Sequence, residues 1–327
     1  MTTFERLSSP GRITLIKDAI ASLQDAVAKV KDAIASCKDE IAARQDQITL
    51  VPAPLCIYVN TFADTMKKYR SIFNLCLKLF FVAVCALIIN VGKTQPIMHS
   101  HNDYTHALPF WDAYNNRAGV IEADVYCINN VLMVAHDKKD IRPDKTLDKM
   151  YIQPIVQLFN SNQIDSARHF YLMVDIKENA VKVLDVLLAL LQQHPSAFNR
   201  ETNPNAVQVF ISGERPPDTS FHHYPSYIMF DGLPAKKYTP EDLHQVVMIS
   251  DNFRNYSNWN GVGVLPAEDS LAISAVIKEA HAEGKPVRLW GAPDTEACWL
   301  TFIHLNADVI NTDKVKECRA FLNSLKH

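Results

Sequence analysis

From residue 96 onward, short apolar runs alternate along the chain with longer stretches in which apolar residues recur every three or four positions. The first pattern predicts strands and the second predicts amphipathic helices. The predicted strands are Pro96–Ser100, Val120–Tyr126, Val131–Ala135, Tyr171–Ile176, Val207–Ser212, Tyr227–Phe230, Val246–Ile249, Val287–Trp290 and Val309–Ile310. The predicted helices are Pro109–Asn116, Ile152–Asn160, Val181–His194, Pro240–His244, Ala267–Glu283, Thr295–Leu305 and Lys314–Leu325.

This alternation predicts one parallel α/β domain over residues 96–327. If Val120–Ala135 is one strand with a hairpin-like extension, the strand count is eight, which fits a (β/α)8 TIM barrel. A doubly wound open sheet is the alternative. No glycine-rich phosphate loop follows the first predicted strand, so the sequence favours the barrel.

The first 65 residues show a different periodicity. Apolar residues recur at alternating spacings of four and three, which is the heptad pattern of a coiled coil. They are Ile16, Ile20, Leu23, Val27, Val30, Ile34, Cys37 and Ile41. We expect either a homodimer through residues 16–41 or an amphipathic helix packed against another part of the chain.

Residues 66–95 have the layout of a secretory signal peptide. A basic stretch, Met66–Arg70, precedes the apolar run Leu79–Val91, and small residues follow just before Gln95. The run is shorter than the ~20 residues of a membrane-spanning helix. One expectation is therefore a chain that starts at Met66 and is exported to the periplasm or the extracellular space after cleavage. The alternative is an uncleaved anchor that holds the whole chain at a membrane.

Composition limits the classes of function. The 48% hydrophobic and 21% charged content is that of a globular protein, and the net charge of -3 disfavours a nucleic-acid partner. The seven cysteines form no C-x-x-C pair, so a disulfide framework is not expected.

Polar side chains capable of catalysis or metal binding cluster where predicted strands end. In a (β/α)8 barrel these ends meet on one face, which is where active sites of this fold are built. The side chains are His101 after the first strand, Glu122 and Asp124 on the second, His136 after the hairpin extension, Asp175 and Lys177 on the next strand, and Arg288 and Trp290 near the end of the chain.

These residue types together predict cleavage of a phosphodiester. Glu122, Asp124 and Asp175 offer hard oxygen ligands, which suit one divalent cation, Mg²⁺ or Ca²⁺. His101 and His136 titrate near neutral pH and suit general acid–base catalysis. Lys177 and Arg288 are cations suited to phosphoryl oxygens.

Several motifs carry a resemblance to a known superfamily. They are His101-Asn102-Asp103-Tyr104, Glu122-Ala123-Asp124-Val125, His136-Asp137, Asp175-Ile176-Lys177 and Ile310-Asn311-Thr312-Asp313. The chain resembles the superfamily of glycerophosphodiester phosphodiesterases and phosphatidylinositol-specific phospholipases C over about residues 96–327. Within it, the chain looks most like the branch containing fungal altered inheritance of mitochondria protein 6 and bacterial relatives.

The resemblance implies a TIM barrel, His101 and His136 as the acid–base pair, and Lys177 beside the phosphate. It implies a metal site at Glu122, Asp124 and Asp175, and a reaction in which a substrate hydroxyl attacks phosphorus to give a cyclic phosphate. Glycerophosphodiesterases usually carry His-Arg-Gly where this chain has His101-Asn102-Asp103, so the usual arginine is absent. Many members also have Glu where this chain has Asp175. We expect Asn102, Arg288 and Trp290 to contact substrate.

The leading hypothesis is an exported, metal-dependent phosphoric diester hydrolase acting on glycerophosphodiesters or phospholipid headgroups in lipid metabolism. The first alternative is a catalytically inactive barrel that binds phosphodiesters, with a membrane surface as a partner. The second is a coiled-coil, membrane-associated scaffold in which the heptad segment is primary.

Overall fold

The structure, a computed structural model, describes residues 95–161 and 169–325. The predicted heptad segment in residues 1–65 and the signal-like stretch up to residue 94 lie outside the described residues.

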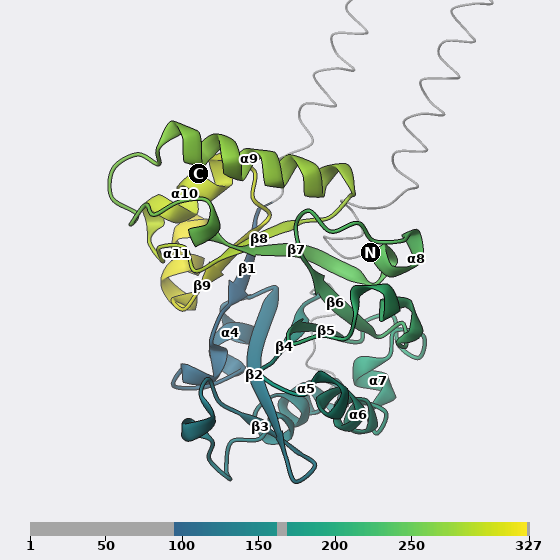
Figure 1. The fold of residues 1–327 in the computed structure, drawn as a ribbon. Coiled ribbons are helices and arrows are strands. Elements are labelled where there is room, and N and C mark those ends of the chain that lie inside the picture. Colours follow the sequence, from purple (N-terminus) through teal and green to yellow (C-terminus); the bar gives the residue numbers. More distant parts are fainter. Residues whose placement is uncertain (1–94, 162–168, 326–327) are drawn as a thin grey trace, which may run out of the picture. The chain divides into compact units, whose positions relative to one another are not determined.

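Eight parallel strands close into a barrel (Figure 1). They are β1 (Ile97–Ser100), β2 (Val120–Ile128), β4 (Tyr171–Ile176), β5 (Gln208–Gly213), β6 (Ile228–Gly232), β7 (Val246–Asn252), β8 (Val287–Trp290) and β9 (Val309–Thr312). The order β1-β9-β8-β7-β6-β5-β4-β2 returns on itself because β1 also pairs with β2. The predicted (β/α)8 barrel is confirmed for the described part of the chain.

The hairpin extension is also confirmed. β3 (Val131–Val134) pairs antiparallel with the second half of β2, through Val125↔Val134 to Ile128↔Val131. The turn between them is Asn129-Asn130, and both asparagines have positive φ, a conformation that asparagine tolerates better than most residues. β3 therefore lies outside the barrel wall.

Helices on the outside connect most strands. They are α4 (Trp111–Asn115), α5 (Gln153–Asn160), α6 (Ala180–Leu191), α7 (Pro195–Phe198), α8 (Pro240–His244), α9 (Ala267–Ala282), α10 (Glu296–His304) and α11 (Val315–Ser324). The short helical turns are η1 (Asp103–Thr105), η2 (Lys138–Asp140), η3 (Asp148–Ile152), η4 (Asp218–His223) and η5 (Phe253–Asn255). The sequence missed α7 and these turns because segments of three to six residues show too little periodicity.

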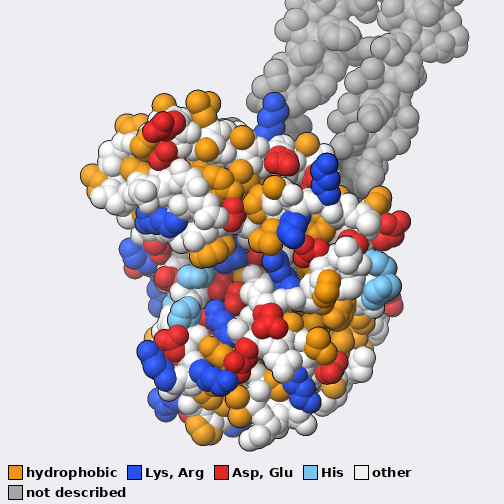
Figure 2. Space-filling view, viewed as in Figure 1, with side chains coloured by type: hydrophobic (Ala, Val, Ile, Leu, Met, Phe, Trp, Pro, Cys, Tyr) orange, Lys and Arg blue, Asp and Glu red, His pale blue; other side chains and the backbone are white. Residues whose placement is uncertain are grey.

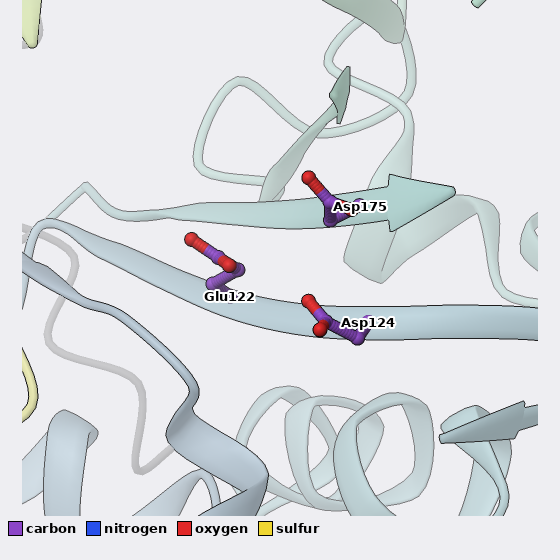
Figure 3. A group of neighbouring side chains, drawn as sticks. All are labelled: Glu122, Asp124 and Asp175. Carbon is purple, nitrogen blue, oxygen red and sulfur yellow. The ribbon is translucent and has the colours of Figure 1, made fainter. Parts of the chain in front are cut away.

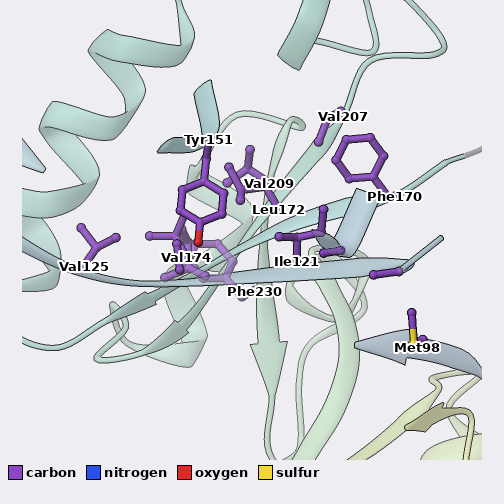
Figure 4. Close-up of a cluster of buried hydrophobic side chains, with 14 of the residues drawn as sticks. Met98, Ile121, Val125, Tyr151, Phe170, Leu172, Val174, Val207, Val209 and Phe230 are labelled. Carbon is purple, nitrogen blue, oxygen red and sulfur yellow. The ribbon is translucent and has the colours of Figure 1, made fainter. Parts of the chain in front are cut away.

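Alternation along β2 separates two environments. Ile121, Ala123 and Val125 belong to the large apolar core that lies between the strands and the helices (Figure 4). Val120 belongs to a small second core with residues of β4, β5, β7 and β9. Because side chains alternate along a strand, Glu122 and Asp124 share the face of Val120 and point into the barrel.

In the described residues, no helix combines the length and the apolar character needed to cross a bilayer.

Candidate active site

Three carboxylates converge at the C-terminal ends of two neighbouring strands. Asp124 on β2 and Asp175 on β4 are register partners, and Glu122 lies two residues before Asp124 on the same face (Figure 3). One oxygen from each of the three lies within 4.8 Å of the others. Gly213 at the end of β5 permits this arrangement, because a Cβ there would lie 2.8 Å from Asp175 Oδ1.

The donor set fits a hard divalent cation. Glu122 and Asp124 are buried, and Asp124 Oδ1 has no hydrogen-bond partner among the described residues. Burial raises the pKa of Asp175, and the neighbouring carboxylates Glu122 and Asp124 add to this effect, while Lys177 opposes it. A cation held by these three oxygens would offset negative charge that Lys177 and Arg288 only partly balance.

Lys177 directly follows β4, and its ammonium group bridges two of the three carboxylates. Its Nζ is 2.7 Å from Asp124 Oδ2 and 2.9 Å from Asp175 Oδ1. Burial disfavours its charge, but Asp175 and Asp124 outweigh burial and raise the pKa of Lys177. The ammonium group is therefore charged at neutral pH and lies beside two of the carboxylates. Its predicted contact with a substrate phosphate stays a prediction.

His101 follows β1 and is oriented by an aspartate from the far end of the chain. Its Nδ1 donates to Asp313 Oδ1 over 2.8 Å, and its Nε2 lies 3.9 Å from Glu122 Oε1. Burial disfavours its charge, but the hydrogen bond to Asp313 and the charge of Glu122 outweigh burial and raise the pKa of His101. The arrangement leaves Nε2 facing the carboxylates and available for proton transfer.

His136 follows β3 and contacts one of the three carboxylates, Asp124. Its Nδ1 lies 2.9 Å from Asp124 Oδ2, and 65% of its side chain is exposed. Tyr104 lies close by, with its hydroxyl 2.8 Å from Asp124 Oδ2 and 2.7 Å from Asn102 Oδ1. Burial and the charge of Asp124 raise the pKa of Tyr104, so the hydroxyl remains a hydrogen-bond donor. Both histidines predicted to act as acid and base thus lie beside the three carboxylates, His101 near Glu122 and His136 near Asp124.

The three predicted substrate contacts occupy different positions. Asn102 adopts a left-handed conformation and donates to Asp313 Oδ1 over 3.2 Å. Trp290 is 40% exposed at the end of β8. Arg288 is only 3% exposed, and its guanidinium donates to Glu122 Oε2 and Asn311 Oδ1. In this structure the guanidinium group of Arg288 is therefore buried and bound to the Glu122 carboxylate.

Four site residues were not predicted. Asp313 orients His101, Tyr104 contacts Asp124, His99 Nε2 donates to Glu122 Oε2 over 2.7 Å, and Asp231 lies 3.6 Å from Arg288. The sequence does give a sign of His99, because it lies two residues before His101 and side chains two apart on a strand share a face. Asp231 was missed although it directly follows the predicted strand Tyr227–Phe230, the same kind of position as the other candidates.

Figure 2 shows one face of the molecule, on which acidic, basic and histidine side chains gather near the middle and hydrophobic side chains lie around them.

Comparison with known proteins finds similar phosphodiesterase domains. Residues 90–167 match the family model of the AIM6-like phosphodiesterase domain. An altered inheritance of mitochondria protein 6 homolog from Arthroderma benhamiae is 24% identical, over 68% of this chain and 83% of the relative. The protein of that name from Saccharomyces cerevisiae (strain YJM789) is also 24% identical, over 79% of each chain.

A solved glycerophosphodiester phosphodiesterase from Parabacteroides distasonis aligns with a TM-score of 0.46 and 13% identity, over 71% of this chain and 98% of that one. The barrel assignment rests on the strand pairing of this chain and does not need that alignment. The resemblance that the motifs carry is confirmed by the family match: this chain is similar to the AIM6-like phosphodiesterases.

Proposed function

We propose that this chain is a metal-dependent phosphoric diester hydrolase that acts on glycerophosphodiesters or phospholipid headgroups. The observation that carries the proposal is the convergence of Glu122, Asp124 and Asp175 with two histidines, each paired with an aspartate. The match of residues 90–167 to a phosphodiesterase domain supports the same reaction class.

Glu122, Asp124 and Asp175 would hold one Mg²⁺ or Ca²⁺. When bound, the cation supplies Lewis-acid stabilisation of negative charge on a phosphoryl oxygen. Lys177 would add a second positive charge beside the phosphoryl oxygens, since its Nζ lies within 3 Å of the carboxylates of Asp124 and Asp175.

The two histidines divide the proton transfers. One imidazole removes the proton from the attacking hydroxyl as the new P–O bond forms, and the other delivers a proton to the leaving oxygen as its bond to phosphorus breaks. A vicinal hydroxyl of the substrate as nucleophile gives a cyclic phosphate, and water gives the hydrolysed monoester. Asp313 holds the His101 ring so that Nε2 faces the substrate.

The remaining residues would position the substrate. Trp290 offers an exposed ring at the rim of the site, and Asn102 lies next to His101 with its amide held by Asp313 and Tyr104. Asn102 stands where glycerophosphodiesterases usually carry arginine. Among the described residues, Lys177 is therefore the partly exposed cation nearest the carboxylates, and it would take the place of that arginine beside the phosphate.

The test is hydrolysis by the full chain of glycerophosphodiesters and of phosphatidylinositol, phosphatidylcholine and lysophospholipids, with products identified by phosphorus NMR. We expect turnover that EDTA abolishes and added Mg²⁺ or Ca²⁺ restores, and its loss in His101→Ala and His136→Ala. Turnover that survives EDTA or both substitutions contradicts the mechanism. Binding of a diester with no product would favour the inactive, ligand-binding barrel instead.

We further propose that residues 66–95 place the barrel outside the cytosol or at a membrane. Support comes only from the basic, apolar and small-residue layout of that stretch. Mass spectrometry of the purified native protein decides between the two alternatives: a mature terminus near Gln95 indicates export, and recovery of residues 1–65 indicates an anchored chain with the heptad segment present.

A further inference from the structure

The loop after β1 contacts Asp313 at two points, and a histidine makes each contact. His101 Nδ1 lies 2.8 Å from the Asp313 carboxylate, and His106 Nε2 lies 3.0 Å from the main-chain carbonyl oxygen of Asp313. The two loops follow β1 and β9, which are neighbours in the barrel wall. Asp313, the residue that orients His101, is therefore held by the loop after β1 through both its side chain and its backbone.

The other ring nitrogen of His106 contacts a buried carboxylate. Nδ1 lies 3.2 Å from Asp103 Oδ1, and Asp103 is fully buried. Three further donors, at 2.6 to 3.0 Å, bind the same carboxylate: Ser100 Oγ, the backbone N of Phe110 and the Tyr151 hydroxyl. Among the described residues, His106 is the one cationic group paired with Asp103. Because a buried carboxylate needs a charged partner as well as hydrogen bonds, Asp103 favours a positive charge on His106.

The two contacts of His106 define its protonation state. The Asp103 carboxylate and the Asp313 carbonyl oxygen are both acceptors, and a neutral imidazole has a single N–H to donate. Both contacts are hydrogen bonds only when each ring nitrogen carries a proton. His106 is therefore an imidazolium in this structure.

The surroundings of His106 support that charge. The hydrogen bond to Asp103 raises the pKa of His106, burial opposes this effect, and the bond to the Asp313 carbonyl and the charges of Asp103 and Asp112 add to it. The ring is closely packed, with 13% of the side chain exposed. The other titratable groups nearby are paired with these acids: Lys316 from α11 with Asp112, the Tyr151 hydroxyl with Asp103, and His101 with Asp313.

Asp313 depends on such contacts because it lies outside the sheet. β9 ends at Thr312, and 53% of the Asp313 side chain is exposed, so packing does little to hold it. Its backbone N donates to Asp294 Oδ2 over 2.9 Å, and its carbonyl oxygen accepts from His106. These two bonds hold the peptide groups on both sides of the Asp313 Cα and so set the direction of its side chain.

We propose that His106 is a positioning residue: as an imidazolium it ties the Asp313 backbone to buried Asp103 and so holds the Asp313 carboxylate against His101. The inference rests on the proposed function, because it states how the acid–base residue His101 is kept oriented and makes that orientation depend on pH. When the pH rises above the pKa of His106, the ring keeps one N–H and loses one of its two hydrogen bonds. The backbone of Asp313 is then released, and the orientation of His101 is lost with it.

Two substitutions separate the two contacts. The side-chain amide of asparagine reaches about as far as Nδ1 of histidine, and that of glutamine about as far as Nε2. His106→Asn therefore keeps a donor for Asp103 and loses the donor for Asp313, whereas His106→Gln keeps the donor for Asp313. With the full chain and a soluble glycerophosphodiester, kcat should fall about tenfold in His106→Asn with KM unchanged, and His106→Gln should recover most of that loss.

Proton–nitrogen correlation NMR of the imidazole rings tests the same contacts without turnover. In the wild type, His106 should titrate above pH 6.5, and neutral His101 should carry its proton on Nδ1, toward Asp313. His101 should shift toward the Nε2–H form in His106→Asn, and in the wild type at the pH where His106 loses its proton. His281→Asn is the matched control, since it removes a histidine–aspartate pair outside the site and should leave His101 unchanged.

A wild-type His106 that titrates at or below pH 6.5 overturns the proposal, and this measurement needs no variant to fold. An unchanged His101 tautomer in folded His106→Asn, or an equal loss of kcat in His106→Asn and His106→Gln, also overturns it. Failure of the proposed function gives a different result: the wild type turns over no diester, while the spectra still show His106 doubly protonated and His101 dependent on it.

Discussion

Arg288 and Glu122 form a buried ion pair inside the barrel, with Arg288 Nη2 3.0 Å from Glu122 Oε2. The same oxygen accepts from His99 Nε2 over 2.7 Å. Two buried donors thus occupy Oε2, whereas Oε1 lies 3.9 Å from His101 Nε2. In the proposed metal site, Glu122 would therefore offer one oxygen, Oε1, to the cation.

Replacing Arg288 should weaken cation binding. Arg288→Met removes one of the two donors to Oε2 and leaves Glu122 less well oriented, and loss of such a supporting contact typically lowers metal affinity by about 10- to 100-fold. Isothermal titration calorimetry with Mg²⁺ and Ca²⁺ measures this directly. Removing one partner of a buried pair also destabilises a fold by about 3–5 kcal/mol, so circular dichroism must show that the variant is folded at the temperature used.

Arg319→Met is the matched control for Arg288. Arg319 donates to the backbone carbonyls of Asn116 and Arg117, on the outside of the barrel. Its loss should leave metal affinity unchanged. Equal affinities for the wild type and Arg288→Met would show that Arg288 does not position Glu122.

Asp313→Asn should reduce turnover and shift its pH profile. The hydrogen bond from His101 to Asp313 helps raise the pKa of His101, so the amide should let that pKa fall. The limb of the pH–rate profile that reports His101 should then move to lower pH, and kcat should fall about 10²- to 10⁴-fold as the ring loses its orientation. Assays on a soluble diester across pH, with proton NMR titration of the imidazole, test both effects.

A second histidine–aspartate pair provides the control. His281 Nε2 lies 2.7 Å from Asp308 Oδ2, outside the candidate site. Asp308→Asn should leave the pH–rate profile where it is. A profile that moves equally in both variants would refute the role assigned to Asp313.

Cation binding should raise the thermal stability of the chain. Glu122, Asp124 and Asp175 lie within 4.8 Å of one another, and their mutual repulsion falls when a cation binds. At a cation concentration about 100 times the dissociation constant, the stabilisation is about 2.7 kcal/mol. Differential scanning fluorimetry with EDTA, Mg²⁺ or Ca²⁺ should show the rise in the wild type and none in Asp175→Asn.

The exposed acid Asp144 gives the comparison for this experiment. It pairs with Arg142 in an exposed loop, so Asp144→Asn should keep the full cation-dependent rise. If Asp175→Asn also keeps the rise, the cation binds elsewhere.

The barrel and most of the site could be predicted because both depend on local patterns. Strand periodicity placed Glu122, Asp124 and Asp175 on inward faces, and strand ends placed His101 and His136 beside them. The rule that connects strand ends to one face of the barrel needs no knowledge of side-chain contacts.

What the sequence missed depends on contacts between distant residues. His101 and Asp313 are 212 residues apart, and the local sequence around either residue does not predict the hydrogen bond between them. Arg288 was predicted to contact substrate because a cation at a strand end often does. Its burial against Glu122 and Asp231 depends on which side chains point inward from strands on the far side of the barrel.

Lys285 should make the stability of the fold depend on pH in the alkaline range. Its Nζ donates to the carbonyl oxygen of Val246 over 2.6 Å, and burial lowers the pKa of Lys285 to about 8. In the unfolded chain the pKa is near 10.5. Between about pH 8 and pH 10.5 the unfolded state therefore binds more protons, and this group's contribution to stability rises with pH, by less than about 1.4 kcal/mol per pH unit.

Urea denaturation of the wild type and Lys285→Met at about pH 7, 8, 9 and 10 isolates that contribution as the difference between their free energies of unfolding. The difference should shift in favour of the wild type as pH rises above about 8, because methionine has no proton to lose. Lys278→Met, at an exposed position on α9, should leave the pH dependence of the wild type unchanged. A difference that stays constant from pH 7 to pH 10 would show that Lys285 titrates alike in both states.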